Sequence, residues 1–546
     1  MNLLEVNNLS ISLPGMISLV ENISFALKKG VVTGLVGESG SGKSITAHSV
    51  LKLLPSPLIC SGQIIWKQPE SSDIDLQNTV GKDLRRFRGG KVGMVFQDPS
   101  ASLNPSIRIG KQVLEALFLH RDIRKKAAKR VVLDIFAKVQ LPNPERIFKS
   151  YPFQLSGGQR QRVMIAMALI NNPELLIADE ATTALDVTVQ YEIIELLKKM
   201  QEERQLTVLF ITHDLSLLSG FADNLMVMRN GKIIEQGAFE HVFSSPDEAY
   251  TKGLVACRPV LSSRGFRLPM VEDFEHNPNY SRQKLEPNVL NEVTGLFCTE
   301  NVNIWYNAGS SSAFHAVKNV SFCVHKGETL GLVGESGCGK TTLSKALLQL
   351  IPYGGQMTLD GNILAYRSRS GELAFRRKIQ FVFQDPYTSL NPQICIGNLL
   401  IEVLKVHKVE NGQKALTSRA LKLLEQVGLT PNYFSSYPHQ LSGGQRQRVA
   451  IARALATEPD VIVLDEAVAA LDVSVQAKIL NLLNDLKQKF QLTYLFISHD
   501  LEVVHYMADR IMVMKDGEII EVNTATDLFK KPMQEYTRTL IQTVKT

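Results

Sequence analysis

The chain has 546 residues, which is too long for a single hydrophobic core, so several domains are expected. Its 44% hydrophobic and 21% charged residues are typical of a folded protein, and a formal net charge of +6 is too small to indicate a nucleic-acid-binding surface. No run of about 18 uninterrupted apolar residues occurs, and the start MNLLEVNNLSISL lacks the basic and apolar parts of a secretory signal, so we expect neither a membrane span nor such a signal.

The first motif is a glycine-rich loop between a predicted strand and a predicted helix. The apolar run VVTGLV precedes GESGSGKS, which fits the pattern G-x-x-x-x-G-K-[ST]. Glycines let such a loop wrap a polyphosphate so that its N–H groups donate to it, the lysine neutralises phosphate charge, and the last hydroxyl ligates Mg²⁺. A tight glycine turn without a ligand is set aside because the motif recurs later in the same context. The residues expected to bind nucleotide are Gly37, Glu38, Ser39, Gly40, Ser41, Gly42, Lys43 and Ser44, with Ser44 also a Mg²⁺ ligand.

A glutamine and a basic run follow. Gln97 comes directly after the predicted strand MVF, and its amide suits a contact to Mg²⁺ or to an attacking water, although in isolation it would be an ordinary loop amide. The basic run RDIRKKAAKR at 121–130 could bind nucleic acid, but it also fits the solvated face of a helix, which is the interpretation we adopt. We therefore expect no nucleic-acid partner.

The nine residues LSGGQRQRV at 155–163 contain no carboxylate, histidine or cysteine, so this segment alone cannot supply a general base or a thiol nucleophile. They contain a hydroxyl, two glycines and an amide ahead of a predicted helix. Such a turn can direct backbone N–H groups and a helix N-terminus at an anion. The candidate contacts to that anion are Ser156, Gly158 and Gln159.

Two apolar strands with polar ends come next. LLIADE at 175–180 places apolar residues before two acids, the pattern of a central parallel strand that ends at a ligand site. We expect Asp179 to hold Mg²⁺ through water, and Glu180 to orient or deprotonate the attacking water. His213, after VLFIT, is expected to contact the γ-phosphate. An isolated acidic pair or histidine at a strand end is usually structural, and only the combination of motifs indicates hydrolysis.

The chain carries all of these motifs twice. LSGGQRQRV recurs letter for letter at 441–449, and the tail AYTKGL at 249–254 corresponds to EYTRTL at 535–540. The second-copy residues expected to bind nucleotide are Gly334, Glu335, Ser336, Gly337, Cys338, Gly339, Lys340, Thr341, Thr342, Ser442, Gly444 and Gln445. Those expected to catalyse hydrolysis or to hold Mg²⁺ are Gln384, Asp465, Glu466, His499 and again Thr341.

The repeat defines the expected domains. We expect a first domain at 1–257, a linker at 258–293 and a second domain at 294–546, because the middle segment is irregular and rich in Pro, Asn, Arg and Ser. The interval between corresponding residues falls from 297 at the glycine-rich loops to 287 at the glutamines. The first copy therefore has extra residues, which we expect in the polar stretch QPESSDIDLQNTV, interpreted as a surface loop.

Cysteine usage favours a reducing compartment. The six cysteines have no CxxC spacing, which fits reduced thiols better than disulfides or a metal site. Cys338 lies within GESGCGKT, just before a predicted helix and a lysine, so its thiolate form is expected to be favoured. The alternative is that cysteine is simply small enough for this loop.

The order GESGxGK[ST], glutamine loop, LSGGQ, DE and HD resembles the nucleotide-binding domain of ATP-binding cassette (ABC) transporters, and it covers nearly the whole chain twice. LSGGQ is the signature motif of that family. The resemblance implies an α/β fold in which two homologous ABC nucleotide-binding domains are fused in tandem. Each would have a P-loop NTPase core with a parallel sheet, an antiparallel β subdomain and an α-helical signature subdomain. It also implies ATP and Mg²⁺ as cofactors and ATP hydrolysis as the reaction.

In this family two such domains pair head to tail, which would explain why one chain carries the signature twice. The first signature would then serve nucleotide held by Lys340, and the second would serve nucleotide held by Lys43. Asp186 and Asp472 would lie in loops that communicate between the two sites. The aromatic residue that stacks on adenine would be Tyr306 in the second copy, whereas the corresponding residue of the first copy is Leu13.

The strings QDPxxSLNP and SYPxQLSGGQRQRV and the YT tails are similar to the ATPases of the peptide (oligopeptide, dipeptide) and nickel importer family. This resemblance implies peptide import with two membrane-spanning permease subunits and an extracytoplasmic substrate-binding protein. The chain would lie peripherally on the cytoplasmic face of the inner (plasma) membrane and contact it only through the permeases. The alternatives are a soluble tandem-cassette ATPase acting on ribosomes, which usually has a long charged helical linker, and an importer of metal chelates or glutathione-like cargo.

Overall fold

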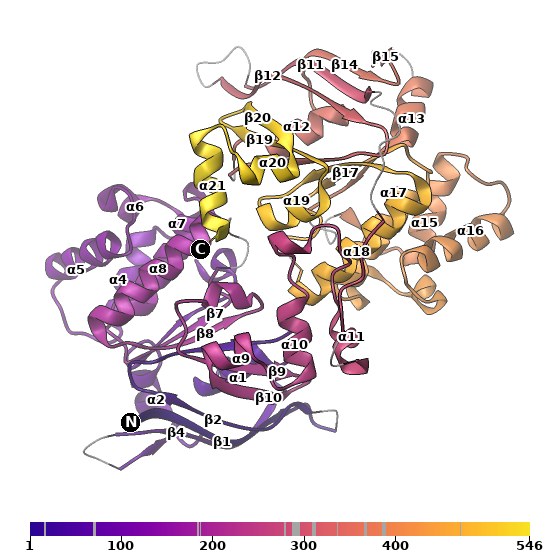
Figure 1. The fold of residues 1–546 in the computed structure, drawn as a ribbon. Coiled ribbons are helices and arrows are strands. Elements are labelled where there is room, and N and C mark those ends of the chain that lie inside the picture. The colour runs from indigo at the N-terminus through magenta and orange to yellow at the C-terminus, as the bar shows by residue number, and fades with distance from the viewer. Residues whose placement is uncertain are drawn as a thin grey trace. The chain divides into compact units, whose positions relative to one another are not determined.

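The computed structural model describes residues 1–546 except 16–17, 69–71, 183–184, 186, 278–279, 287–294, 308–312, 336, 365–368, 385–388, 470 and 546. The chain divides into two compact units (Figure 1). Unit 1 comprises Met1–Ala256 and Val271–Asn279, and unit 2 comprises Cys257–Met270 and Tyr280–Thr546. Within the part of the chain that the structure describes, none of the helices has the length and apolarity needed to cross a membrane.

Two sheets form the frame of unit 1. Its strands are β1 (Asn2–Ser12), β2 (Ser18–Lys28), β3 (Val32–Val36), β4 (Ile59–Trp66), β5 (Ile74–Asp75), β6 (Val92–Val95), β7 (Leu175–Asp179), β8 (Thr207–Thr212), β9 (Asn224–Arg229) and β10 (Lys232–Ala238). The smaller, antiparallel sheet has the order β2-β1-β4-β5, and the larger has the order β10-β9-β3-β8-β7-β6. In the larger sheet the strands from β9 to β6 are parallel and β10 is antiparallel to β9. Every residue of β3 and β7 is buried, as expected for parallel strands covered on both faces.

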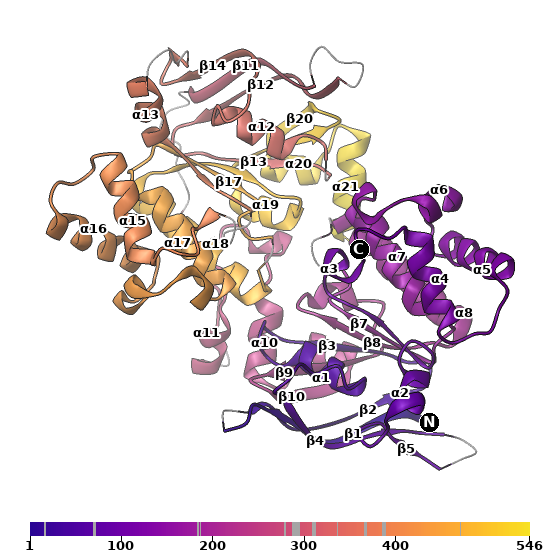
Figure 2. The same cartoon turned by 180° about the vertical axis from the view of Figure 1, so that it is seen from behind.

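Helices cover this frame and form a separate helical subdomain. They are α1 (Lys43–Val50), α2 (Gly81–Phe87), α3 (Pro99–Ser102), α4 (Ile109–Phe118), α5 (Lys125–Lys138), α6 (Pro144–Lys149), η1 (Pro152–Gln154), α7 (Gly157–Leu169), α8 (Val187–Arg204), η2 (Leu215–Leu218), α9 (Phe239–Ser244), α10 (Ala249–Ala256) and α11 (Val271–His276). Helices α4 to α7 pack on one another and are grouped together in Figure 2. The second half of the basic run at 121–130 forms the start of α5, where Lys125, Lys126 and Arg130 are exposed.

Unit 2 repeats this arrangement. Its strands are β11 (Gly295–Tyr306), β12 (Phe314–His325), β13 (Thr329–Val333), β14 (Gly354–Leu359), β15 (Asn362–Ile363), β16 (Ile379–Val382), β17 (Val461–Asp465), β18 (Thr493–Ile497), β19 (Arg510–Lys515) and β20 (Glu518–Thr524). Its helices are α12 (Lys340–Leu347), α13 (Arg369–Lys378), α15 (Ile396–Val406), α16 (Gln413–Gln426), η4 (Pro431–Ser435), η5 (Pro438–Gln440), α17 (Gly443–Leu455), α18 (Val473–Phe490), α19 (Leu501–Met507), α20 (Ala525–Lys530) and α21 (Glu535–Lys545). The sheet orders are β12-β11-β14-β15 and β16-β17-β18-β13-β19-β20.

One hydrophobic core in each unit joins both of its sheets. In unit 1, Leu4 and Trp66 of the antiparallel sheet share a buried cluster with Ile177 and Leu209 of the parallel sheet. The glycine-rich loops lie at the ends of β3 and β13, which pair with parallel strands on both sides. The core therefore holds the ends of the parallel strands, where the candidate site residues are, in a fixed arrangement.

The segment between the two copies contains ordered structure. Residues 257–270, which include η3 (Leu261–Ser263), belong to unit 2, whereas α11 belongs to unit 1. In unit 2 the side chain of Asn481 on α18 donates to the Leu268 carbonyl at 2.8 Å and accepts from the Leu268 N–H at 3.1 Å. Arg267 forms an ion pair with Asp485. The segment is thus anchored through specific side chains of α18.

The structure also tests the expected insertion in the first copy and the expected reduced state of the cysteines. The connection between β4 and β5 spans residues 67–73, where the second copy has the two-residue turn Asp360–Gly361, so part of the extra length lies where we expected it. The expectation of reduced thiols throughout was wrong, because the structure contains a disulfide between Cys298 and Cys323. These residues face each other across β11 and β12, and only the strand register brings them together.

Candidate functional site

Both glycine-rich loops have the backbone shape that their glycines make possible. Gly37 has φ of 151°, and a Cβ there would lie 2.1 Å from the Met228 carbonyl oxygen, so no side chain fits. Gly42 is left-handed with φ of 104° and caps the start of α1. The second loop repeats both features at Gly334 and Gly339. The loop can follow this path only with glycine at these places.

The loop lysines are buried and donate to their own loops. Lys43 Nζ donates to the carbonyls of Gly37 and Glu38 at 2.8 and 2.9 Å. Lys340 donates to Gly334 and Glu335 at 2.7 and 2.8 Å. Each ammonium group therefore lies inside the curve of its loop, where a phosphate acceptor could replace the carbonyls.

In each unit the structure brings together two of the expected Mg²⁺ ligands, the loop hydroxyl and the strand-end aspartate. Ser44 Oγ donates to Asp179 Oδ1 at 2.9 Å. In unit 2, Asp465 Oδ2 accepts from Ser344, which was not among the expected ligands, at 3.1 Å, and Asp465 Oδ1 is buried without a hydrogen-bond partner. The expected ligand Thr341 interacts with the same carboxyl group and lowers its pKa. Burial raises the pKa of both aspartates, which a nearby cation would counteract. A buried carboxylate oxygen that lacks a donor, beside a hydroxyl, fits an oxygen-ligated Mg²⁺.

The two candidate catalytic glutamates have the same unusual backbone. Glu180 and Glu466 adopt φ of 47° and 48°, a left-handed conformation that is uncommon outside glycine and typical of functional sites. Their N–H groups donate to the next strand of the sheet, at Ile211 and Ile497. This turn at the end of β7 and β17 directs each carboxylate away from the strand.

In unit 1, Glu180 is contacted by the two other predicted site residues. Gln97 Nε2 donates to Glu180 Oε2 at 2.7 Å, and His213 Nδ1 lies 3.9 Å from Glu180 Oε1. Three segments far apart in the sequence, at the ends of β6, β7 and β8, thus converge on one carboxylate.

Unit 2 repeats the cluster at shorter distances. Gln384 Nε2 donates to Glu466 Oε2 at 2.5 Å, and His499 Nδ1 lies 3.4 Å from Glu466 Oε1. Burial by itself would raise the pKa of Glu466, but His499 and Lys340 together hold it below its usual value. Burial likewise opposes the charged form of His499, and the contact with Glu466 nevertheless raises the pKa of His499. The carboxylate is therefore stabilised as the charged form that a water-activating base requires.

The signature turns are helix caps. Ser156 accepts from the Gln159 N–H and its own N–H donates to the Gln159 side chain, a capping box at the start of α7. Ser442 and Gln445 repeat this box at the start of α17.

The signature glycines allow close helix packing. A Cβ at Gly158 would lie 2.8 Å from Val189, and one at Gly444 would lie 2.3 Å from Val475. The serine, glycine and glutamine of each signature therefore have structural roles in their own unit, in addition to the nucleotide contacts expected from the sequence.

The base-binding side differs between the copies. Tyr306 is 41% exposed, and its hydroxyl lies 3.3 Å from Thr342 Oγ1 on the helix that follows the second loop. The adjacent Trp305 stacks on His315 with ring centroids 3.7 Å apart. Leu13 stands in the first unit at the position that corresponds to the tyrosine. An aromatic surface beside the loop is therefore a feature of unit 2 that Leu13 does not supply in unit 1.

One sequence expectation about reactivity was wrong. Burial raises the pKa of the Cys338 thiol, although Lys340 Nζ lies 3.8 Å from its sulfur. The thiol is 9% exposed, and the helix and lysine do not compensate for the lost water.

Ser336 and Asp186 lie outside the described residues. Sequence reasoning also missed His48, whose Nε2 lies 3.6 Å from Asp179, because a histidine within a helix carried no motif.

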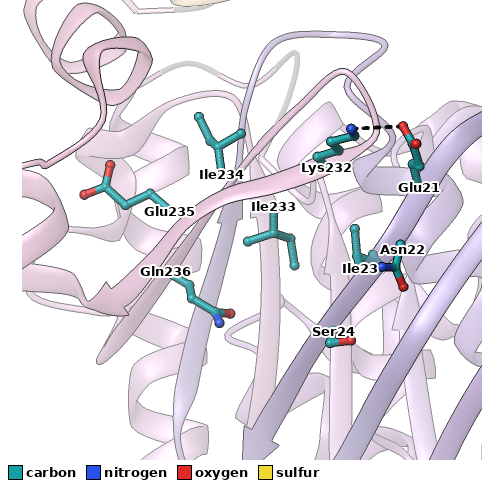
Figure 3. Close-up of a pocket in the computed structure, with 9 residues that line it drawn as sticks. All are labelled: Glu21, Asn22, Ile23, Ser24, Lys232, Ile233, Ile234, Glu235 and Gln236. Carbon is teal, nitrogen blue, oxygen red and sulfur yellow. Dashed lines mark ion pairs between the residues drawn. The ribbon is translucent and has the colours of Figure 1, made fainter.

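A pocket of about 480 Å³ lies elsewhere in unit 1, between β2 and β10 (Figure 3). Lys232 and Glu21 form an ion pair at 3.2 Å across it. The corresponding pair in unit 2 is Glu518 and Lys318, at 3.9 Å, with the charges exchanged. Because the pair persists while its polarity reverses, we interpret it as a link between the two sheets and not as a binding site.

Comparison with known proteins also finds two cassettes in this chain. The sequence model described as ABC transporter matches residues 20–183 and 317–469. The chain belongs to the ABC transporter family. It is 41% identical over 560 residues to the glutathione import ATP-binding protein GsiA of Escherichia coli (strain K12), covering 100% of this chain and 89% of that protein. The protein of the same name from Pectobacterium atrosepticum is 40% identical over 555 residues, covering 99% of this chain and 89% of that protein.

A solved dimeric structure of the bacterial ABC transporter cassette MJ0796 is 31% identical, covers 42% of this chain and 98% of that chain, and has a TM-score of 0.39. The family match and the full-length relatives confirm the resemblance to tandem ATPases of the peptide and nickel importer family. They also confirm the α/β class with two ABC domains and the assignment of the chain as an ATP-binding ATPase.

Proposed function

We propose that this tandem ABC ATPase powers the import of peptides or peptide-like cargo. The observation that supports the ATPase part of the proposal is the presence, in both units, of a loop lysine, a buried aspartate and a glutamate that a glutamine and a histidine contact. Neither unit lacks a group required for hydrolysis. Relatives 41% identical over their aligned length are named for glutathione import, and glutathione is itself a short peptide.

ATP is bound in this proposal by the loop residues, and Mg²⁺ by Ser44 with Asp179 in unit 1 and by Thr341 with Asp465 in unit 2. When bound, the Mg²⁺ ion would neutralise negative charge on the β- and γ-phosphates. Gln97 and Glu180 position and deprotonate the attacking water in unit 1, with His213 beside them, and Gln384, Glu466 and His499 act in the same way in unit 2. Tyr306 stacks on adenine at the second loop.

Two membrane-spanning permease subunits and an extracytoplasmic substrate-binding protein complete the proposed importer. The chain acts at the cytoplasmic face of the membrane and contacts it through the permeases. Co-purification with two permeases encoded beside this chain, and ATP-dependent uptake of labelled glutathione or oligopeptides by vesicles containing them, tests this assignment. Co-sedimentation with ribosomes without permease binding would instead support the translation alternative.

Each ATP is proposed to bind between the loop of one cassette and the signature of the other. Lys43→Ala combined with Ser442→Arg then damages one site twice, whereas Lys43→Ala with Ser156→Arg damages both sites. The assay counts MgATP trapped per chain in a Glu180→Gln, Glu466→Gln background. The first pair should retain about half of the trapped nucleotide and the second essentially none. The reverse order would mean that each signature serves the loop of its own cassette.

A further inference from the structure

In each unit the helix that carries the YT tail contacts the phosphate loop of the same unit. In unit 1 the hydroxyl oxygen of Tyr250, on α10, accepts a hydrogen bond from the Glu38 N–H at 3.2 Å. In unit 2 the hydroxyl oxygen of Tyr536, on α21, accepts from the Glu335 N–H at 3.1 Å. Tyr250 is only 3% exposed, so its position is fixed by the surrounding protein. The sequence indicated that the YT tails correspond, but it assigned them no role.

A carboxylate fixes the helix that carries each tyrosine. Glu235 on β10 accepts from the N–H groups of Asp247 and Glu248 at 2.9 and 3.3 Å, just ahead of α10. Glu521 on β20 holds the residues ahead of α21 in the same way, at 2.9 and 3.0 Å. An acid at a helix N-terminus satisfies free N–H groups and favours the helix dipole. The start of each helix is therefore tied to the core sheet.

A cation lies over each tyrosine ring. Arg229 Cζ is 4.6 Å from the Tyr250 ring centroid, and Lys515 Nζ is 4.8 Å from that of Tyr536. These cations end β9 and β19, the strands whose Met228 and Met514 carbonyls leave no room for a Cβ at the first loop glycines. The same strand end thus supports both the loop and the ring that contacts it.

The peptide unit that joins Gly37 to Glu38 has a partner on each side. Its N–H, which belongs to Glu38, donates to the tyrosine, and its carbonyl, which belongs to Gly37, accepts from Lys43 at 2.8 Å. A lysine that turns to a phosphate gives up this carbonyl, whereas the tyrosine can keep its hydrogen bond to the N–H of the same peptide unit. The second loop has the same two contacts on the peptide unit that joins Gly334 to Glu335, with Lys340 Nζ at 2.7 Å from the Gly334 carbonyl.

We propose that Tyr250 and Tyr536 are positioning residues that keep the phosphate loops in their binding shape when the loop lysines engage nucleotide. The proposal rests on the assignment of these loops as the nucleotide sites. It makes α10 and α21 part of the nucleotide sites of their units, through hydroxyl groups that act on the loop backbone and not on the nucleotide or the reacting water.

Phenylalanine substitutions test this inference, because they remove the hydroxyl and keep the ring under its cation. ADP binding is measured by calorimetry on the full chain, since ADP contacts the loop and is not hydrolysed. Tyr250→Phe should weaken binding at one class of site about tenfold, because a backbone N–H loses its acceptor. Tyr536→Phe should weaken ADP binding at the other class of site, and the double variant should weaken it at both classes. Tyr353→Phe, which removes a half-buried hydroxyl 3.4 Å from the Gln349 amide, is the matched control and should change neither.

Three further measurements separate positioning from a general loss of structure. Inorganic pyrophosphate, which has no base, should lose affinity by the same factor as ADP. The KM for ATP should rise while kcat at saturation stays within about twofold. The thermal unfolding midpoint without nucleotide should match that of Tyr353→Phe.

Unchanged ADP affinity in both tail variants, or a fall in kcat at constant KM, would overturn the positioning role while leaving the proposed function intact. Failure of the unmodified chain to bind ADP at all would overturn both.

Discussion

Replacing Asn481 by alanine should release the segment 257–270 from unit 2. The side chain is 2% exposed and makes two hydrogen bonds, at 2.8 and 3.1 Å, to the backbone of Leu268, which is itself 1% exposed. Leaving a buried donor or acceptor without a partner costs about 1–3 kcal/mol for each group. Allowing for partial access of water, we expect a loss of about 2–4 kcal/mol in docking free energy, which increases the undocked population about 30-fold to several hundredfold.

Limited trypsin digestion measures that population. Arg264 and Arg267 lie in the segment, and their side chains are engaged in unit 2: Arg264 donates to the Ala508 carbonyl at 2.6 Å, and Arg267 pairs with Asp485. Cleavage of a transiently released segment tracks the equilibrium population of the open form when closing is faster than cleavage. Mass spectrometry of the early products should therefore show cleavage after these arginines faster by about the same factor.

The chain offers its own control. Glu195 on α8 stands where Asn481 stands on α18 and is exposed, so Glu195→Ala should leave the cleavage rate unchanged. If Asn481→Ala is cleaved within twofold of the unmodified chain, the two hydrogen bonds do not hold the segment and the reasoning fails.

Three other outcomes are expected. Glu180→Gln with Glu466→Gln should bind MgATP but lose about 10²–10⁴-fold in turnover, the usual contribution of general-base catalysis, and near-normal steady-state hydrolysis would contradict the assignment. Cys338 should react with iodoacetamide more slowly than the half-exposed Cys395, because burial raises its pKa; mass spectrometry showing the opposite order would restore the reactive-thiol interpretation. Leu13→Tyr should increase the affinity of the first site for ATP about fivefold and leave its affinity for tripolyphosphate unchanged. An equal increase for both ligands would exclude stacking on the base.

The parts of the site that follow from chain order were predictable. A strand that leads into a glycine-rich turn and a strand that ends in Asp–Glu are both typical of a parallel sheet. The carboxyl ends of parallel strands lie at the same edge of that sheet. Gln97 and Glu180 could therefore be placed in one site from the sequence, and they lie 2.7 Å apart. The left-handed backbone at the glutamate has no signal in the sequence, because non-glycine residues seldom adopt it.

What depends on register or burial was not predictable. The cross-strand partner of Cys298 is set by where β11 and β12 pair, and a separation of 25 residues does not specify that pairing. The prediction for Cys338 was based on its charged neighbour and the following helix, which favour the thiolate. The sequence does not show that the thiol is buried, and burial raises its pKa. The tail tyrosines stand 212 and 201 residues from the loops they contact, so only folding reveals their position.

The division of the middle segment has a practical consequence for separating the cassettes. Residues 257–270 belong to unit 2, and α11 after them belongs to unit 1. A break after residue 256 therefore takes α11 from the first cassette, where Val271 leaves no room for a side chain at Gly253 and Glu275 pairs with Arg229. A break after residue 279 instead leaves the segment that contacts Asn481 attached to the first cassette. No single cut between 256 and 280 yields two half-proteins that each retain all of their own parts, so a split-chain version of this ATPase needs the segment supplied twice.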